Sequence, residues 1–237
     1  MVRLWVKICG IRDEEAALAA LEAGADAIGF VFAESPRRVD PATTGRIAAT
    51  LRARAAAAGL PIPALVGVFV NAPVERVLAT ARAAGLTHVQ LHGDEGDTDV
   101  QALQASGLSV IKAVGVAPGT PLPPNALSTP ADLVLLDRCE PGRRGGTGRT
   151  ADWVVAAAVA QRRPVILAGG LRPDNVAEAV RAVRPWGVDI SSGVERARGV
   201  KDPHLIARFV RAARLAWEEV RAGTEADARE PAAETPA

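Results

Sequence analysis

The sequence is poor in cysteine and aromatic residues, carries almost no net charge and has no long apolar run. Its two cysteines, Cys9 and Cys139, are too few for a disulfide framework, and the start of the chain shows no charged-then-apolar signal pattern, so we expect a cytoplasmic protein. The alanine-rich apolar stretches are broken by arginine before they reach the roughly 20 residues of a membrane span. With 28 basic and 27 acidic residues the net charge is +1, which predicts no nucleic-acid and no membrane partner. A negatively charged ligand must therefore be bound by a local site.

Short β-branched segments alternate with longer segments rich in Ala, Leu and Arg, which is typical of βα units on a parallel sheet. We expect eight strands, at Leu4–Cys9, Asp26–Phe32, Ala64–Val70, His88–His92, Ser109–Val114, Asp132–Asp137, Pro164–Ala168 and Val188–Ser191. We expect seven clear helices, at Asp13–Ala23, Pro41–Ala58, Pro73–Ala84, Thr98–Ala105, Ala151–Ala160, Pro173–Val183 and Asp202–Val220. Between the fifth and sixth strands the proline-rich run "APGTPLPPNALSTP" predicts an irregular crossover with at most one short helix.

This order of elements predicts an α/β protein with a single-domain (β/α)8 fold, the TIM barrel, over residues 1–222. The 237 residues, 49% of them hydrophobic, allow one large α/β domain or two small ones, and TIM barrels typically have about 250 residues. A doubly wound open sheet usually has fewer strands and a Gly-rich turn after the first strand, whereas "KICGIRDEE" has a single glycine. The small, charged and proline-containing stretch over 223–237 predicts a disordered tail.

In a barrel the reacting groups lie where the strands end, so those positions are the candidate site. The loops after the last two strands often hold a phosphate group through backbone N–H groups. Gly169-Gly170 and Ser191-Ser192-Gly193 lie in those loops, and a short helix beginning near Gly193 would add its positive end. Ordinary turn glycines are the alternative interpretation.

Cys9 ends the first strand and Asp137 ends the sixth. A thiolate can act as a base if its pKa is lowered from about 8.5, and a carboxyl can act as an acid if burial raises its pKa from about 4. The alternative for Cys9 is a small buried hydrophobe. Lys7 shares a strand face with Cys9 and should line the barrel interior below it, where a lysine needs a counter-charge. Asp26 and Asp189 are both candidates for that partner.

Gln90 and His92 also share one strand face, and we expect them with Lys7 among the residues that form the substrate pocket. A structural hydrogen-bonding role is the alternative for His92. The glycine-rich loop "RCEPGRRGGTGRT" is expected to fold over bound substrate. Because Cys139 lies in it, oxidative cross-linking to Cys9 is a further hypothesis.

Eight segments, in order between Val6 and Lys201, carry a resemblance to a known family. They are "KICGI", "GADAIGFVFAESPRRV", "VGVFVN", "VQLHGDE", "IKAVGV", "LLDRCEPGRRGGTGRTADW", "ILAGGLRPDNV" and "VDISSGVE". Together they resemble the phosphoribosylanthranilate isomerases of tryptophan biosynthesis. The resemblance implies an Amadori rearrangement of N-(5-phosphoribosyl)anthranilate to 1-(2-carboxyphenylamino)-1-deoxyribulose 5-phosphate, with no metal or organic cofactor.

The resemblance also implies roles for individual residues. Cys9 corresponds to the general base and Asp137 to the general acid. Arg37 corresponds to the arginine that binds the anthranilate carboxylate, and Asp189 to a polar residue near the substrate's amino nitrogen. The phosphate loops of the family coincide with the glycine and serine loops above. We expect a phosphosugar substrate and a monomer or homodimer.

Two other functions compete with this interpretation. An indole-glycerol-phosphate synthase would need a lysine acid and glutamate partners at the strand ends, where this chain has Cys9 and Asp137. A non-catalytic barrel that binds a sugar phosphate would differ from an isomerase only in the absence of turnover.

Overall fold

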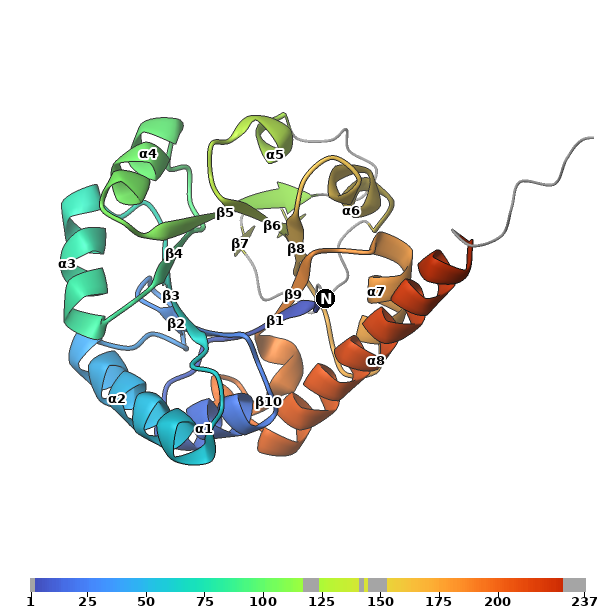
Figure 1. The fold of residues 1–237 in the computed structure, drawn as a ribbon. Coiled ribbons are helices and arrows are strands. Elements are labelled where there is room, and N and C mark those ends of the chain that lie inside the picture. The colour runs from blue at the N-terminus through green and yellow to red at the C-terminus, as the bar shows by residue number, and fades with distance from the viewer. Residues whose placement is uncertain (1–2, 117–123, 141–142, 145–152, 228–237) are drawn as a thin grey trace, which may run out of the picture.

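The structure, a computed structural model, describes residues 3–116, 124–140, 143–144 and 153–227. Within this part, the side chains of residues 139–140, 143–144 and 225–227 are not described. The described chain forms a ring of strands surrounded by helices (Figure 1). This arrangement is the predicted TIM barrel.

Eight parallel strands form the closed barrel, in the order β5-β4-β3-β2-β1-β9-β8-β6 with a further pairing of β5 to β6. They are β1 (Trp5–Cys9), β2 (Ala27–Val31), β3 (Ala64–Phe69), β4 (His88–Leu91), β5 (Ser109–Val116), β6 (Leu133–Glu140), β8 (Val165–Leu167) and β9 (Gly187–Ile190). Each coincides with a predicted strand to within three residues at either end. The sequence analysis did not predict β7 (Arg143–Arg144), which pairs antiparallel with the end of β6.

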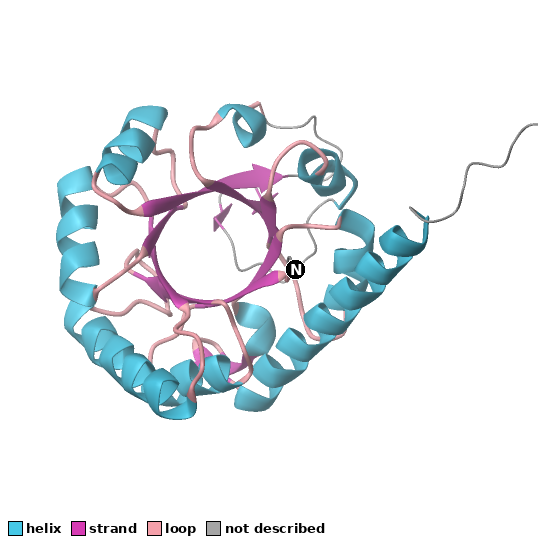
Figure 2. Ribbon diagram, viewed as in Figure 1, coloured by secondary structure: helices cyan, strands magenta, loops and turns pink. Residues whose placement is uncertain are grey.

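Helices cover the outside of the barrel (Figure 2). They are α1 (Glu14–Glu22), α2 (Pro41–Ala58), α3 (Val74–Ala84), α4 (Asp97–Ala105), α5 (Asn125–Ser128), α6 (Trp153–Ala160), α7 (Val176–Val183) and α8 (Pro203–Asp227). Asp13 caps α1 and Asp40 caps α2, each carboxylate accepting a hydrogen bond from a free backbone N–H of the first turn. The four-residue α5 is the single short helix expected in the irregular crossover.

Two helix boundaries differ from the prediction by three residues or more. Helix α7 begins at Val176 rather than Pro173, because the Asn175 side chain accepts a hydrogen bond from Arg172 N at 2.7 Å and closes a turn before the helix. Helix α8 continues to Asp227, beyond its predicted end at Val220 and beyond the domain boundary predicted at residue 222. Residues 228–237, the rest of the predicted tail, lie outside the described residues.

The apolar core has two parts. The larger part lies between the strands and the surrounding helices. The smaller part comprises buried residues from five strands and the residue that follows β8: Ala27, Val66, Ile111, Ala113, Leu135, Ile166 and Ala168. Trp5 and Trp186 pack against this smaller core, with ring centroids 5.3 Å apart. The parallel order then places the carboxyl ends of all eight strands, and their polar residues, at one rim.

After β9 the chain makes a short 3-10 helix, η1 (Ser192–Val194), close to the position predicted for a helix near Gly193. It continues into a small antiparallel pair, β10 (Glu195–Ala197) and β11 (Val200–Lys201), which the sequence analysis did not predict. This pair returns the chain to the rim before α8 begins.

Candidate active site

Lys7 lies beneath the rim with no exposed surface, on the same face of β1 as Cys9. Its Nζ donates to Asp189 Oδ1 and to Gln90 Oε1, both at 2.9 Å. Burial alone would lower the pKa of Lys7, but the Asp189 carboxylate and the Cys9 thiol raise it above its usual 10.5. Asp189 is therefore the counter-charge, and the other candidate, Asp26, pairs instead with Arg214 at 2.6 Å.

Cys9 is 7% exposed at the rim. Burial raises the pKa of its thiol above its ordinary value, and the Lys7 ammonium offsets only part of that effect. The structure therefore does not supply the lowered pKa that a base requires in the free protein. Room for the thiol comes from Gly29 on β2, where an added Cβ would lie 2.8 Å from Cys9 Sγ.

Asp137 lies in β6, directly after the last residue of that strand that pairs with β8, and is 8% exposed. Its Oδ1 accepts a hydrogen bond from Arg138 N at 2.8 Å, and its Oδ2 lies 3.3 Å from His92 Nε2. His92 Nδ1 is in turn 2.8 Å from Gln90 Nε2. Asp137 is thus linked through His92 and Gln90 to Lys7.

Arg37 lies in the loop after β2 and extends over Gly10, where an added Cβ would lie 2.6 Å from Arg37 Cδ. Its Nε and Nη2 donate to the two carboxylate oxygens of Glu195 at 2.6 and 2.9 Å. Lys201 Nζ donates to the same carboxylate at 3.0 Å and to Ser191 O at 2.9 Å. The β10–β11 pair therefore fixes Arg37 and the loop after β9 together.

Glu195 and Lys201 were missed by the sequence analysis. In the run "GVERARGVKDP" they resemble ordinary surface charges, and only the return of β11 beside β10 brings them under the rim. Burial would raise the pKa of Glu195, but hydrogen bonds from Arg37, Lys201 and Gly199 N–H lower it to about 2. The pKa of Lys201 is lowered, because burial outweighs the attraction of Glu195.

The predicted phosphate loops form one small cavity of about 60 Å³. Its lining includes Gly169, Gly170, Ser191, Ser192 and Gly193. Gly169 and Gly170 have positive φ values of 82° and 67°, which favour glycine, and an added Cβ at Gly193 would lie 2.0 Å from a backbone oxygen. The glycines are therefore required by the backbone geometry of the cavity.

A second cavity of about 170 Å³ lies beside the first. Among the residues that line it are Cys9, Arg37, Gln90, His92, Asp137, Asp189 and Ser191. Asp137, Asp189 and Ser191 also line the smaller cavity, so the two are adjacent. All the predicted site residues except Lys7 therefore line these two cavities. Lys7 is buried and supports the cavity through Asp189 and Gln90.

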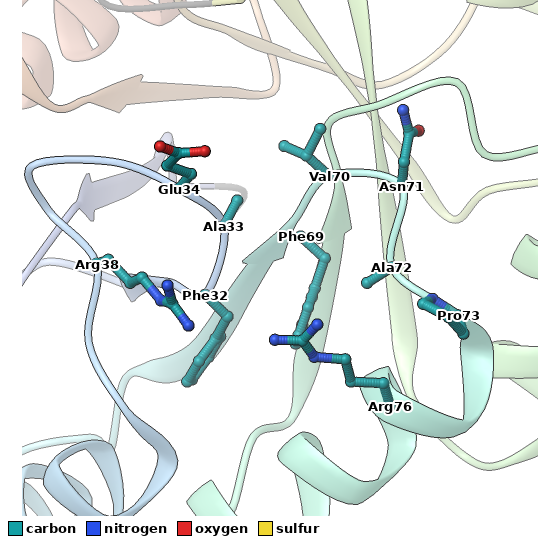
Figure 3. Close-up of a pocket in the computed structure, with 10 residues that line it drawn as sticks. All are labelled: Phe32, Ala33, Glu34, Arg38, Phe69, Val70, Asn71, Ala72, Pro73 and Arg76. Carbon is teal, nitrogen blue, oxygen red and sulfur yellow. The ribbon is translucent and has the colours of Figure 1, made fainter.

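A larger cleft of about 560 Å³ opens between the loops after β2 and β3 and shares Ala33, Glu34 and Val70 with the 170 Å³ cavity. Phe32 and Phe69 stack in its floor, with ring centroids 5.2 Å apart. Figure 3 shows Arg38 and Arg76 reaching toward this stack from opposite sides. These two exposed arginines place positive charge next to the site.

Part of the predicted site lies outside the described residues. In the loop expected to cover substrate, residues 138–150, only Arg138, the backbone of 139–140 and that of 143–144 are described. The Cys139 side chain is not described, so its cross-linking to Cys9 stays a prediction.

In the part of the chain that the structure describes, no three His, Cys, Asp or Glu side chains are arranged to hold a metal ion. Over the same residues, no helix has the length and apolar character to span a membrane.

Comparison with known proteins gives one consistent result. Residues 6–212 match the family model of N-(5'-phosphoribosyl)anthranilate isomerase. An N-(5'-phosphoribosyl)anthranilate isomerase of Rubrobacter xylanophilus is 46% identical over 211 residues, covering 88% of this chain and 98% of the relative.

Two solved structures agree with this match. The dimeric phosphoribosylanthranilate isomerase of Thermotoga maritima, solved as monomers, is 38% identical with a TM-score of 0.75, covering 89% of this chain and 98% of the other. A phosphoribosylanthranilate isomerase in complex with reduced 1-(o-carboxyphenylamino)-1-deoxyribulose 5-phosphate is 37% identical with a TM-score of 0.72, covering the same shares of both chains.

Proposed function

The chain belongs to the N-(5'-phosphoribosyl)anthranilate isomerase family, and from that premise we propose that Cys9 and Asp137 perform the proton transfers of its reaction. The protein is an isomerase of tryptophan biosynthesis that carries out the Amadori rearrangement of N-(5'-phosphoribosyl)anthranilate. This assignment replaces the two competing functions, the synthase and the non-catalytic barrel. The single observation that supports the proposed roles is that the thiol and the carboxyl line one cavity beside the glycine-rich loops.

Asp137 acts first, as an acid. It gives a proton to the furanose ring oxygen, the bond from that oxygen to C1 breaks, and the nitrogen lone pair forms the C1=N bond. The products are a protonated Schiff base and an Asp137 carboxylate. Arg138 N–H and His92 both contact that carboxylate, so the charge that develops on it is solvated by the protein.

Cys9 then acts as a base. Its thiolate takes the proton from C2, the electron pair forms the C1=C2 bond, and the iminium nitrogen regains its lone pair. Because burial raises the pKa of Cys9, its thiol must first release its proton to solvent, and the resulting thiolate is stabilised by the nearby Lys7 ammonium and by the positive charge of the Schiff base next to C2. Finally the enol hydroxyl returns a proton to Asp137 while C1 receives the proton held by Cys9. Both groups end in their starting states, so we expect no cofactor.

Arg37 is positioned to bind the anthranilate carboxylate. Glu195 occupies the edge of the guanidinium formed by Nε and Nη2. The edge formed by the two terminal nitrogens then remains to donate two parallel hydrogen bonds to a second carboxylate. The phosphate is expected in the smaller cavity, at the backbone N–H groups of Gly169, Gly170 and Gly193. Asp189, between the two cavities, is near the place of the amino nitrogen.

The test compares the turnover and the ligand affinity of the variants Cys9→Ala and Asp137→Asn with those of the parent protein. Loss of anthranilate fluorescence on mixing with freshly generated substrate measures turnover, and a reduced product analogue measures affinity. We expect each variant to lose roughly 10²- to 10⁴-fold in kcat while its affinity stays within a few-fold. Asp174→Asn, at a carboxylate whose side chain is 67% exposed, is the matched control. A variant at either proposed position that keeps the kcat of the parent protein would refute its role.

Two further expectations rest on the family. The reduced product binds to a relative, and the Thermotoga maritima relative is dimeric. We therefore propose a phosphosugar substrate and a monomer or homodimer for this chain, in the cytoplasm. Sedimentation velocity of the purified protein measures its oligomeric state directly.

A further inference from the structure

We propose that Lys7 and Gln90 hold His92 as the tautomer that carries its proton on Nε2, and that this N–H positions Asp137 for its role as the acid. The inference deepens the proposed function and rests on it for the role of Asp137. It also reassigns three residues that the sequence analysis placed among the substrate-binding groups. They are positioning residues that act through Asp137.

The first step is the orientation of the Gln90 amide. An ammonium group has three donors and no acceptor, so only the amide oxygen of Gln90 can face Lys7. The Lys7 Nζ to Gln90 Oε1 distance is 2.9 Å, and the two side chains are 0% and 1% exposed, so water does not compete. Asp189 holds the ammonium in place from the other side at 2.9 Å. The buried charge therefore fixes which end of the amide points away from it.

The second step is the tautomer of the imidazole. With its oxygen facing Lys7, Gln90 presents its NH₂ group to His92 Nδ1 at 2.8 Å. An amide nitrogen only donates, so Nδ1 must be the acceptor and cannot carry a proton. The proton of the neutral ring is then on Nε2. Rotating the amide to favour the other tautomer would turn NH₂ toward the Lys7 ammonium, which has no acceptor for it.

The third step is the contact with Asp137. His92 Nε2 lies 3.3 Å from Asp137 Oδ2, and Arg138 N donates to Oδ1 at 2.8 Å. Each carboxyl oxygen thus faces one N–H donor. When Asp137 gives its proton to the ring oxygen, negative charge develops on a group with two donors already aimed at it. Because a neutral donor bonds more strongly to a carboxylate than to a carboxylic acid, His92 favours the proton transfer itself rather than substrate binding.

The same geometry excludes a different role for His92. Its Nδ1 lone pair is engaged by Gln90 and its Nε2 carries a proton, so the neutral ring has no free lone pair for a substrate proton. His92 is therefore a donor at the rim and not a second general base.

The tautomer can be measured without turnover. In ¹⁵N-labelled protein with neutral histidines, two-bond nitrogen–proton correlation spectra distinguish a protonated from an unprotonated ring nitrogen. The chain has 3 histidines, so the spectrum of His92→Gln identifies the His92 signals by their absence. We expect Nε2 protonated and Nδ1 unprotonated in the wild-type protein. A ring protonated on Nδ1, or averaged equally between both forms, would overturn the proposal.

The kinetic test uses a matched pair at one position. The amide nitrogen of Gln can occupy the place of His Nε2 and donate to Asp137, whereas that of Asn reaches only the place of Nδ1. We expect His92→Gln to keep kcat within a few-fold, and His92→Asn to lose about 10- to 100-fold in kcat with KM within about twofold. Equal kcat values in the two variants, whether both high or both low in folded protein, would contradict the positioning role.

The role of Asp137 as the acid and the positioning role of His92 can be refuted independently. If Asp137→Asn retains full turnover, the proposed acid is wrong, while the tautomer of His92 is still measured in the wild-type protein. If Asp137→Asn is inactive but His92 is protonated on Nδ1, only the positioning inference is wrong.

Discussion

Replacing Glu195 by Gln perturbs the junction between the carboxylate-binding arginine and the phosphate loop. The Glu195 side chain is 6% exposed and accepts hydrogen bonds from Arg37 at 2.6 and 2.9 Å, from Lys201 at 3.0 Å and from Gly199 N at 3.1 Å. Glutamine keeps the shape but removes the negative charge. Two cations then share the site without their common anion, and one of them, Lys201, has a side chain only 1% exposed.

The expected cost follows from the pKa of Glu195. Lowering that pKa from 4.5 to about 2 is equivalent to ~3 kcal/mol in the free energy of unfolding. The folded-state pKa lies below the unfolded one, so this contribution is complete above about pH 4.5 and is lost as the pH falls toward 2. Because the side chain is buried, little of the contribution should be screened by solvent.

The assay is urea unfolding of the parent protein and Glu195→Gln at about pH 7 and about pH 3. We expect Glu195→Gln to be less stable by ~3 kcal/mol at the higher pH and the gap to narrow at the lower one. Glu22→Gln is the matched control, since Glu22 pairs with Arg54 at 2.7 Å with both side chains 49% exposed, and such pairs contribute about 0–1 kcal/mol. A gap that does not change with pH, or one no larger than in the control, would refute the reasoning. Since Arg37 loses its anchor, KM should rise as well.

Other substitutions test other parts of the site. Lys7→Met leaves a buried carboxylate without its cation, and we expect urea unfolding to show a loss of ~3–5 kcal/mol, whereas a loss below about 1 kcal/mol would contradict this. In Gly29→Ala the new Cβ would lie 2.8 Å from Cys9 Sγ and 3.1 Å from Cys9 Cα. We therefore expect kcat to fall at least roughly tenfold and the free energy of unfolding to fall by ~1–3 kcal/mol. An unchanged kcat would contradict the close packing of Gly29 against Cys9. Arg38 and Arg76 line the larger cleft, where their positive charge should attract the anionic substrate. The double variant Arg38→Gln and Arg76→Gln should therefore have a lower kcat/KM at low salt and a weaker dependence of kcat/KM on ionic strength. An unaltered salt dependence would show that the cleft does not steer the substrate.

The fold was predictable because the relevant signals are local. Alternating β-branched and helical segments located all eight barrel strands, and Asp40 followed by Pro41 marked the start of α2 to the residue. Strand parity then placed Lys7 and Cys9 on one face, and strand ends placed Asp137 at the rim. The Gly169-Gly170 pair and Gly193, which follow the last two barrel strands, were also found, since positive φ at the first two and close backbone approach at the third require glycine.

The remaining features depend on which residues meet in space. Nothing in the spacing distinguished Asp189 from Asp26 as the partner of Lys7, because that choice is made by the pairing of β1 with β9. The clamp formed by Glu195 and Lys201 depends on a two-stranded return that has no strong sequence pattern. The direction of the Cys9 pKa shift depends on burial by surrounding strands, which composition does not reveal.

A crystal structure of this protein with a reduced, unreactive product analogue tests the central claim most directly. The account predicts the phosphate at the N–H groups of Gly169, Gly170 and Gly193, with Cys9 Sγ within about 3.5 Å of C2 and Asp137 within hydrogen-bonding distance of the oxygen that was in the ring. A complex in which either side chain lies out of reach of those atoms while the phosphate occupies its cavity would contradict it.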